Sequence, residues 1–298
     1  MDNKYLVDII ILNFNQESDT AECILSLKRM NYKNYRIILV DNGSTDGSGG
    51  RLKERFKYIE FLKSGENIGF AGGANIGIKR SLESGLANYI LLLNNDTVVG
   101  EELLDSLLEV AEMDNEIGVI GAVNFYYSWP DKVHMAGHRF LWWLGIQGKV
   151  FDVGSNFKEV QSVSACCMLI KRKVVEKAGL LDERFFVYYE DSDFCLRARR
   201  AGFKVGVARD AKVWHKINRT LGTGTPREYY IYTRNQPLFM LKHCPRLFLP
   251  NYFAVYFSKV FIRIIYFFVT LRKDFSVWIY RGLADFIKGN FGKGRLFE

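Results

Sequence analysis

The first 125 residues alternate short apolar runs with helical patterns, and this alternation restricts the fold more than any other feature of the chain. The runs at 7–13 (VDIIILN) and 35–41 (YRIILVD) are β-branched and lack a helical period, which predicts strands buried on both faces of a sheet. Further strands are expected at 59–62, 89–93 and 118–123. Helices are expected at 17–30, 73–84 and 101–113. The order predicts an α/β fold with a doubly wound, mainly parallel sheet flanked by helices.

Ligands of such a sheet collect beyond the carboxyl ends of its strands. The stretches that follow predicted strands are polar or glycine-rich: 13–16, 41–46, 64–73 and 94–96. Asp41 ends the second strand and opens the turn DNGSTDGS, where its carboxylate is suited to accept the imide N–H of uracil or thymine. Taken alone, the turn is equally explained by Asp46 or Ser48 capping the next helix.

A second polar turn, in LLLNNDT at 91–97, places Asn94 and Asp96 at the end of an apolar strand. Mg2+ and Mn2+ take oxygen ligands and commonly bridge a protein carboxylate and a diphosphate. We therefore predict a divalent-metal site with Mg2+ or Mn2+ as cofactor, and an ordinary turn is the alternative. His215, after what resembles a short edge strand, is a candidate third ligand, although lone histidines are usually structural.

The loop after His215 continues through GTGTPREYYIYTRNQ, where glycines and threonines indicate mobility. Arg227 and Arg234 in this stretch are candidate phosphate ligands, with solvated arginines as the alternative.

An acidic group, Glu190, Asp191 and Asp193, stands just before an amphipathic helix. Carboxylates in a first helical turn stabilise the helix dipole, which is one explanation. The aromatic residues at 185–189 favour another, because a carboxylate beside aromatic rings is partly desolvated and binds protons more tightly, as a general base requires.

The segments around the acidic group are also predicted from their patterns. Residues 125–160 have aromatics and glycines without a sustained period, which predicts a loop or small hairpin beside the site. A strand at 163–170, a helix ending near Gly179 and a helix ending at Gly202 are expected to follow. The glycines at 69–77 lack dinucleotide-binding spacing, which disfavours a Rossmann dehydrogenase.

The net charge of +8 is concentrated at the C-terminal end. Residues 242–298 hold ten Lys or Arg and three Asp or Glu, a net +7, which leaves +1 for residues 1–241. A nearly neutral folded domain is not expected to bind nucleic acid. We predict a catalytic domain at 1–241, with a nucleotide-binding half at about 1–125 and an acceptor half at about 126–241, followed by a separable basic, aromatic helical tail at 242–298.

The tail is strongly apolar at 247–271 but carries Lys259 and Arg263 four residues apart on one helical face. This pattern favours a helix lying in the plane of an anionic membrane surface through 245–298. A transmembrane span and a helix that pairs with a second copy of the chain are the alternatives.

Cysteine usage and the N-terminus predict a cytoplasmic protein. Five cysteines include no C-x-x-C pair, which fits a reducing compartment. MDNKYLVDIIILN has no long apolar region, so no secretory signal is expected. With the tail, this predicts a peripheral protein at the cytoplasmic face of the cell membrane.

Taken in order, five motifs resemble glycosyltransferase family 2, especially its rhamnosyltransferase-like branch. The similarity covers nearly the whole region before the tail, and the motifs are IIILNFNQ at 9–16, VDNGSTDGS at 40–48, ENIGFAGGANIG at 66–77, LLLNNDT at 91–97 and CCMLIKR through FFVYYEDSDFCLRARRAG at 166–202. Two positions depart from the wider family, since Asn42 and Asn94 replace acids there.

The resemblance implies a GT-A fold and an inverting glycosyltransferase that uses a dTDP- or UDP-linked sugar. It implies Asp191 as general base, with Glu190 orienting it or binding acceptor, and a metal at Asp96, His215 and Asn94. The predicted donor-nucleotide residues are Asn13, Asn15, Asp41, Gly43, Asn67, Gly72, Asn75 and Asn95. A glycan or polyprenyl-linked oligosaccharide in cell-surface polysaccharide synthesis is the expected acceptor.

The sequence disfavours two other functions. A non-catalytic nucleotide-sugar-binding scaffold is disfavoured because Asp41, Asp96 and Asp191 are all present. A nucleotidyltransferase is disfavoured because 13–16 has neither glycine nor a cation.

Overall fold

A computed structural model describes residues 4–217 and 224–296, so the start of the N-terminal segment and part of the loop predicted to be mobile lie outside the described residues. In the described part, a ten-stranded sheet has the order β10-β12-β6-β11-β4-β1-β2-β3, with β5 on β12 and β7 on β6, and β8 pairs with β9 separately. The strands are β1 Val7–Asn13, β2 Tyr35–Asp41, β3 Glu60–Lys63, β4 Tyr89–Leu93, β5 Thr97–Val99, β6 Ile117–Tyr126, β7 Trp129–Met135, β8 Gly137–Leu141, β9 Ile146–Val150, β10 Phe157–Glu159, β11 Cys167–Lys171 and β12 Lys204–His215.

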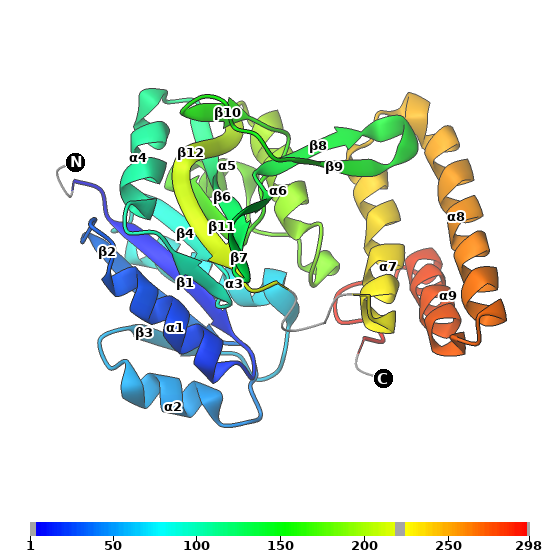
Figure 1. Ribbon diagram of the computed structural model, residues 1–298, viewed down its shortest axis with the longest axis horizontal. Coiled ribbons are helices and arrows are strands. Elements are labelled where there is room, and N and C mark those ends of the chain that lie inside the picture. The colour runs from blue at the N-terminus through cyan, green and yellow to red at the C-terminus, as the bar shows by residue number, and fades with distance from the viewer. Residues whose placement is uncertain (1–3, 218–223, 297–298) are drawn as a thin grey trace.

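Helices cover both faces of the large sheet (Figure 1). One face packs on α1 (Glu17–Lys28), α2 (Ser48–Arg55) and α4 (Leu103–Met113). The other packs on α3 (Gly69–Ser84), α5 (Arg172–Ala178) and α6 (Glu190–Arg200). Alternate residues of β1 supply the two cores, since Ile9 and Ile11 belong to the first and Ile10 to the second. This confirms the predicted doubly wound architecture.

Strands β3, β2, β1 and β4 run parallel, which brings their carboxyl ends to one edge. β11 lies antiparallel between β4 and β6, so the sheet is mixed on that side. β12 runs parallel to β6 and antiparallel to β5, and it pairs His215 with Thr97. That pairing carries His215 to the turn after β4.

The expectation of a short edge strand before His215 is wrong. β12 has 12 residues and lies inside the sheet between β10 and β6. A register shift between Ala208 and Lys212, with Arg209 and Asp210 exposed, interrupts its apolar pattern. The interruption makes only the last part of the strand recognisable in the sequence.

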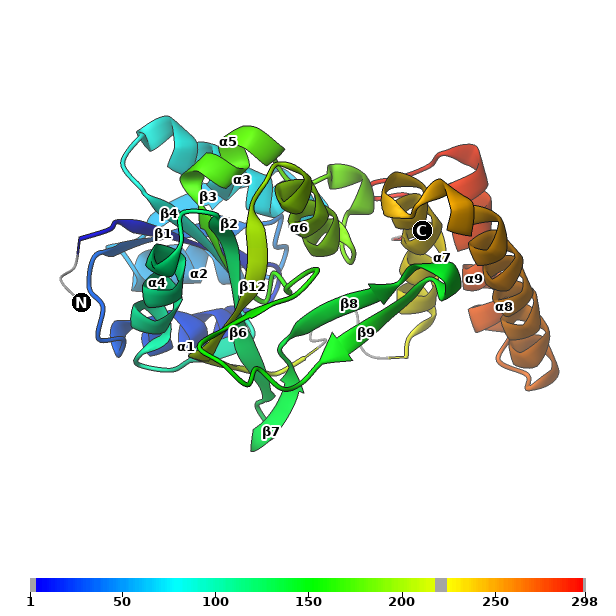
Figure 2. The same ribbon diagram turned by 90° about the horizontal axis from the view of Figure 1, so that it is seen from above.

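The C-terminal region is a bundle of three helices, α7 (Pro226–His243), α8 (Leu249–Val269) and α9 (Lys273–Lys288), beside the α/β part (Figures 1 and 2). The three helices share one core with Phe185 and Leu196 of the α/β part. The predicted boundary at 241/242 therefore falls inside α7. The tail also contacts the α/β part, since Gly292 N donates to Arg184 O at 2.8 Å and Lys293 pairs with Glu66 at 2.6 Å, and its separability stays a prediction.

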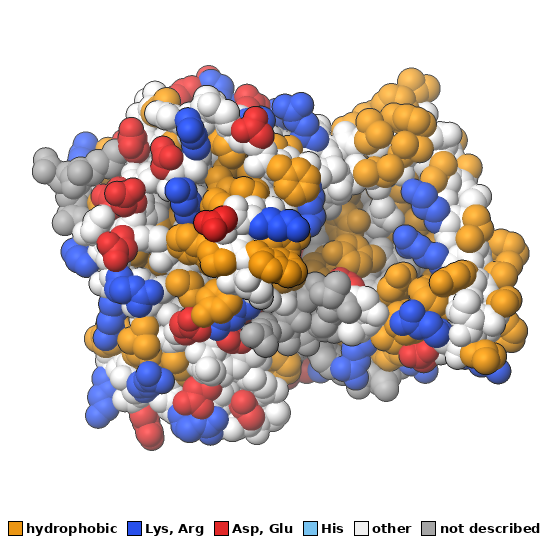
Figure 3. Space-filling model, in the orientation of Figure 1, with side chains coloured by type: hydrophobic (Ala, Val, Ile, Leu, Met, Phe, Trp, Pro, Cys, Tyr) orange, Lys and Arg blue, Asp and Glu red, His pale blue; other side chains and the backbone are white. Residues whose placement is uncertain are grey.

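The outer surface of the bundle is apolar. Among the described residues, one helical segment, Arg246–Val269, has the length and composition of a membrane span, with a mean hydropathy of 1.6. Hydrophobic side chains gather over this end of the molecule (Figure 3). Exposed apolar residues of α8 and α9 include Phe257, Phe261, Ile262, Ile265, Tyr266, Phe268, Val269, Val277, Tyr280 and Ile287.

Candidate active site

Asn13 is the centre of a buried hydrogen-bond network at the carboxyl ends of β1 and β2. Its Nδ2 donates to Asp41 Oδ1 at 3.1 Å and to the hydroxyls of Ser44 and Ser48 at 3.0 Å each. Its Oδ1 accepts a hydrogen bond from Thr20 at 3.0 Å. Asn13 thus holds the Asp41 carboxylate in place, and both side chains are almost fully buried.

The turn after β2 requires an amide and a glycine. Asn42 donates through Nδ2 to Gly69 O at 3.0 Å and accepts through Oδ1 from Ile68 N at 3.3 Å, so it uses both ends of its amide. A carboxylate has no donor for the first bond, which gives Asn42 a structural reason. Gly43 has φ +77°, and a Cβ there would lie 2.3 Å from the backbone of Glu66.

The neighbouring predicted donor residues shape the same loops. Asn15 accepts from Thr45 N at 2.9 Å through its side chain. Asn67 accepts from Gly69 N at 2.9 Å. Gly72 lies in the first turn of α3, buried against Ile68. These residues surround the candidate donor site, and their contact with a nucleotide stays a prediction.

Asn75 has a different environment. Its Nδ2 donates to Leu181 O at 3.0 Å and to Glu183 Oε1 at 2.8 Å, and its Oδ1 accepts from Leu181 N at 3.0 Å. The side chain is 1% exposed. Its polar atoms join α3 to the segment before α6, and a structural role accounts for all of them.

Asn95 extends the network of Asn13 to the end of β4. Its Nδ2 donates to Thr20 Oγ1 at 2.9 Å and to Gln16 Oε1 at 3.0 Å. Thr20 in turn donates to Asn13, so one chain of hydrogen bonds joins the turn containing Asp96 to the Asp41 carboxylate.

Asp96 and His215 meet as the sequence predicts for a metal site. Oδ1 of Asp96 lies 3.0 Å from Nε2 of His215. The same oxygen is buried and accepts no hydrogen bond from any described residue. A buried carboxylate oxygen without a hydrogen-bond donor, next to an imidazole nitrogen, suits a cation, so these residues fit a divalent metal. Asn94 lies partly exposed in the same turn. Within 4–217 and 224–296, no three His, Cys, Asp or Glu side chains gather around such a point.

Two adjacent residues connect this turn to the acidic group. Asn94 N donates to Cys166 O at 3.0 Å, and Ala165 N donates to Asp191 Oδ2 at 3.3 Å. The segment before β11 therefore brings Asp191 to the edge that carries Asp96.

Asp191 and Glu190 open α6 with unequal surroundings. Asp191 is partly exposed and accepts from Ser192 N at 2.6 Å, and burial raises the pKa of its carboxyl. Glu190 is 5% exposed, and its Oε2 has no partner among the described residues. Burial and the charge of Asp191 raise the pKa of Glu190 well above its usual value. Only Asp191 is both basic and accessible.

Asp193, the third acid of the group, is a structural residue. It is fully buried and accepts from His243 Nε2 at 2.7 Å and from Arg197 Nε at 2.8 Å, and it also pairs with Lys242. Although burial opposes ionisation, these donors and cations hold the pKa of Asp193 at about 2. Asp193 is therefore an ionised anchor between α6 and α7.

The segment before Asp191 has a strained backbone. Phe186, Tyr188 and Tyr189 have φ values of 65°, 66° and 76°, which non-glycine residues rarely adopt. Buried Asn235 of α7 holds this segment, because its Nδ2 donates to the carbonyls of Phe185, Val187 and Tyr188 at 2.7, 2.9 and 3.1 Å. Nothing in the sequence of α7 distinguishes Asn235 from a surface residue.

The predicted phosphate ligands are placed differently. Arg227 is exposed in the first turn of α7. Arg234 is fully buried, donates to Phe185 O at 3.3 Å and to Asn235 Oδ1 at 3.0 Å, and stacks over Tyr230. Tyr230 and Asn235, its neighbours on α7, are also buried in the bundle. Arg234 therefore has a packing role.

The described fold is a GT-A fold, with the site at the carboxyl edge of its sheet. A mannosyltransferase from Pyrobaculum calidifontis, solved with GDP-Man and Mn2+, matches with a TM-score of 0.60 at 12% identity over 96% of this chain and 88% of that one. GalNAc-T7, solved with UDP, GalNAc and Mn2+, matches with a TM-score of 0.62 at 14% identity over 80% of this chain and 51% of that one.

The chain belongs to glycosyl transferase family 2, whose sequence model matches residues 8–179, more than half of its length. It is therefore a glycosyltransferase.

Relatives share about a quarter of their residues with it. The dTDP-rhamnosyl transferase RfbF of Shigella flexneri is 28% identical over 80% of this chain and 81% of its own. The low-salt glycan biosynthesis hexosyltransferase Agl10 of Haloferax volcanii is 28% identical over 67% of this chain, which spans 64% of that relative. An N-acetylglucosaminyl-diphospho-decaprenol L-rhamnosyltransferase of Mycobacterium tuberculosis is 23% identical over 73% of this chain and 78% of its own.

Proposed function

We propose that this glycosyltransferase moves a sugar, with inversion, from dTDP-rhamnose or a UDP-sugar to a hydroxyl of a glycan or lipid-linked oligosaccharide in cell-surface polysaccharide synthesis. The names of the relatives from Shigella flexneri and Mycobacterium tuberculosis support rhamnose and a lipid-linked acceptor. The observation that carries the proposal is the link through residues 165–166, which sets an accessible carboxylate beside the turn containing Asp96.

Asp191 is the general base of this proposal. It takes the proton of the acceptor hydroxyl while the acceptor oxygen attacks the anomeric carbon, and the nucleotide diphosphate leaves from the opposite side. Its raised pKa makes it a better proton acceptor than an ordinary aspartate. Burial and the charge of Asp191 raise the pKa of Glu190, and in this proposal Glu190 orients Asp191 or binds the acceptor.

Asp41 holds the base of the donor nucleotide. Its carboxylate is fixed by Asn13, so little conformational entropy is lost when an imide N–H donates to it. The loops held by Asn15, Asn42 and Asn67 form the rest of this donor site.

Asp96 and His215, with Asn94, are the residues that would hold Mg2+ or Mn2+. Such an ion, when bound, neutralises negative charge on the diphosphate leaving group. The buried oxygen of Asp96 that lacks a hydrogen-bond donor supports this assignment, and the two solved GT-A structures contain Mn2+.

The apolar outer face of α8 and α9 rests on the cytoplasmic face of the cell membrane in this proposal, as a peripheral contact. Phe261, Ile262 and Val269 are 65%, 63% and 71% exposed, which is costly in water and favourable at a lipid interface. A contact with a second copy of the chain would cover the same face. Flotation with anionic vesicles and the oligomeric state in solution distinguish the two.

The test compares two isosteric variants. Asp191→Asn is expected to lower kcat by roughly 10²–10⁴-fold, the usual contribution of a general base, and to leave the dissociation constant of the donor nucleotide within about twofold. Glu190→Gln is expected to retain more activity than Asp191→Asn, because the raised pKa of Glu190 favours its neutral form, which the amide resembles. The donor is identified before this comparison. The shift in melting temperature of the protein is measured with dTDP-, UDP- and GDP-sugars in the presence of Mg2+ or Mn2+. Full activity in Asp191→Asn would contradict the base assignment.

A further inference from the structure

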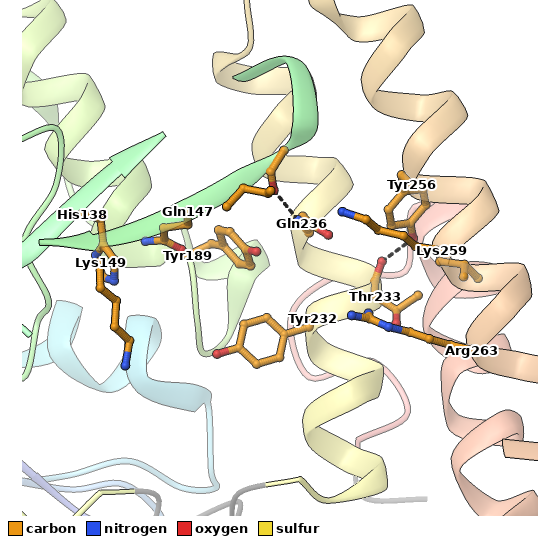
Figure 4. Close-up of a pocket in the computed structure, with 13 residues that line it drawn as sticks. His138, Gln147, Lys149, Tyr189, Tyr232, Thr233, Gln236, Tyr256, Lys259 and Arg263 are labelled. Carbon is orange, nitrogen blue, oxygen red and sulfur yellow. Dashed lines mark hydrogen bonds between the residues drawn. The ribbon is translucent and has the colours of Figure 1, made fainter. Parts of the chain in front are cut away.

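A cavity of about 350 Å3 lies between the α/β part and the helical bundle, bordered by the β8–β9 hairpin, α7 and α8 (Figure 4). Tyr189, two residues before Asp191, forms part of its wall. Three cationic side chains line it, and no Asp or Glu does: Lys149, Lys259 and Arg263. Figure 4 shows Lys149 on the hairpin side and the other two reaching from α8 toward α7.

These cations lack a neutralising carboxylate among the described side chains. In the part of the chain that the structure describes, none of the three forms an ion pair with a carboxylate. Lys149 contacts Nε2 of His134 at 2.9 Å, and the guanidinium of Arg263 lies 5.8 Å from the ring centroid of Tyr229. Burial lowers the pKa of Lys149, which shows that its surroundings disfavour an uncompensated positive charge. A cavity with this charge attracts anions.

The cavity walls are fixed to one another. Gln236 Nε2 of α7 donates to Gly145 O of the hairpin tip at 2.7 Å, and Tyr256 of α8 donates to Thr233 O of α7 at 2.6 Å. Gln147 Nε2 donates to Ser192 Oγ at 3.0 Å, which ties the hairpin to the residue after Asp191. The cavity is therefore a preformed space that adjoins the proposed base.

The chemistry changes in a fixed order across this region. Tyr189 and Gln147, which lie next to the acidic group, form part of the wall. Lys259 and Arg263 line the cavity from α8, and exposed apolar residues such as Phe261 and Ile262 belong to the same helix. A sugar joined to a lipid through a diphosphate has the same order of polar hydroxyls, negative charge and hydrocarbon. One ligand of this kind would meet all three zones.

We propose that this cavity binds the phosphoryl groups of a prenyl-diphosphate-linked acceptor, with Lys259 and Arg263 as the anion ligands and Lys149 closing the hairpin side. The proposal rests on the proposed function, since it assigns the acceptor subsite of that reaction. It also changes the role of Lys259 and Arg263, whose spacing in the sequence favours headgroup contacts outside the protein. Phospholipid headgroups carry the same phosphoryl groups, so the experiments distinguish a prenyl diphosphate from the headgroups of a bilayer.

The first experiment measures transfer by the full chain to one sugar presented as a short prenyl diphosphate and as a neutral octyl glycoside. For Lys259→Gln/Arg263→Gln, the ratio of the KM for the diphosphate acceptor to the KM for the octyl glycoside rises at least about tenfold, because each lost cation weakens a charged hydrogen bond. The matched control is Lys273→Gln/Lys288→Gln, which removes two exposed charges of α9 outside the cavity. An unchanged ratio in the cavity variant overturns the proposal.

The second experiment needs no turnover. Binding of farnesyl diphosphate without a bilayer is compared with cosedimentation on phosphatidylglycerol vesicles. The cavity variant is expected to lose farnesyl diphosphate affinity at least about tenfold relative to the control variant. Loss of vesicle binding with unchanged farnesyl diphosphate affinity assigns the cations to bilayer headgroups and overturns the proposal. The wild-type protein could bind farnesyl diphosphate in the cavity and yet transfer sugar to neither acceptor. That result would contradict the proposed function but support the proposed anion site.

Discussion

Nε2 of His215 and Oδ1 of Asp96 lie 3.0 Å apart without a hydrogen bond between them. A carboxylate oxygen and an imidazole nitrogen at this spacing can both be ligands of one divalent metal, which the proposed reaction uses. β12 delivers the histidine by pairing it with Thr97, one residue from the aspartate.

His215→Ala is therefore expected to weaken Mn2+ binding by at least about tenfold when a nucleotide diphosphate is present, as loss of one metal ligand requires. Titration followed by electron paramagnetic resonance measures the affinity, and EDTA is expected to abolish transfer by the wild type. His138→Ala is the control, since His138 lies on the hairpin cavity and not beside Asp96. Activity that survives EDTA would remove the metal from the mechanism.

The pH dependence of kcat/KM is expected to follow the ionisation of the Asp191 carboxyl. Burial raises the pKa of its carboxyl, and the protonated form cannot accept the acceptor's proton. Activity therefore falls as the pH drops through a value above the usual aspartate pKa of about 3.9. Profiles measured from pH 4 to 9 check this, with the residual rate of Asp191→Asn as the control that lacks this limb. An acidic limb at or below about pH 4 would contradict the raised pKa.

Asn235→Asp is expected to release the strained segment before α6. The substitution removes the amide that donates to three carbonyls and sets a negative charge against them. We expect kcat to fall by about tenfold or more, because small displacements of a reacting group are costly, and the dissociation constant of the donor nucleotide to change little. Single-turnover rates and nucleotide titrations separate these effects. Loss of donor affinity equal to the loss of kcat would indicate general unfolding instead.

Gly43→Ala should destabilise the donor side of the fold by about 1–3 kcal/mol, since a methyl group meets the backbone of Glu66 and the positive φ disfavours alanine. Urea unfolding measures the change. Gly50→Ala is the matched control, because Gly50 lies in α2 with open space around its Cβ position. Alanine there is expected to raise the free energy of unfolding slightly. Equal stability of the two variants would disprove the steric argument.

The sequence predicts the elements whose pattern is local. β1, β2 and β4 have the predicted bounds, because strands buried on both faces are continuous apolar runs. α3 begins at Gly69, before its predicted start at residue 73. The prediction began late because glycines are poor helix formers. Gly73 instead allows close packing of the helix on Leu12 and Asn42. Such packing depends on tertiary contacts that no local pattern contains.

The same distinction applies to the site. Asp41 ends β2 and Asp96 lies in the turn after β4, so their place at the carboxyl edge of the sheet follows from the fold class. The burial of Arg234 and Asn75 does not, because their partners are backbone carbonyls of the segment 181–185, distant in the chain. Asn235 and Lys149 were not predicted for the same reason, and the sequence pattern of Lys259 and Arg263 does not contain their place beside a cavity.

The salt bridge between Lys293 and Glu66 has a consequence for biosynthesis. Glu66 belongs to the loop that borders the donor site, and its partner is 227 residues further along the chain. This contact can form only after the ribosome has translated the segment from Glu66 to Lys293, although the α/β part can collapse earlier. The loop that contains Glu66 therefore receives this contact only after α9 has been synthesised and has docked beside the α/β part.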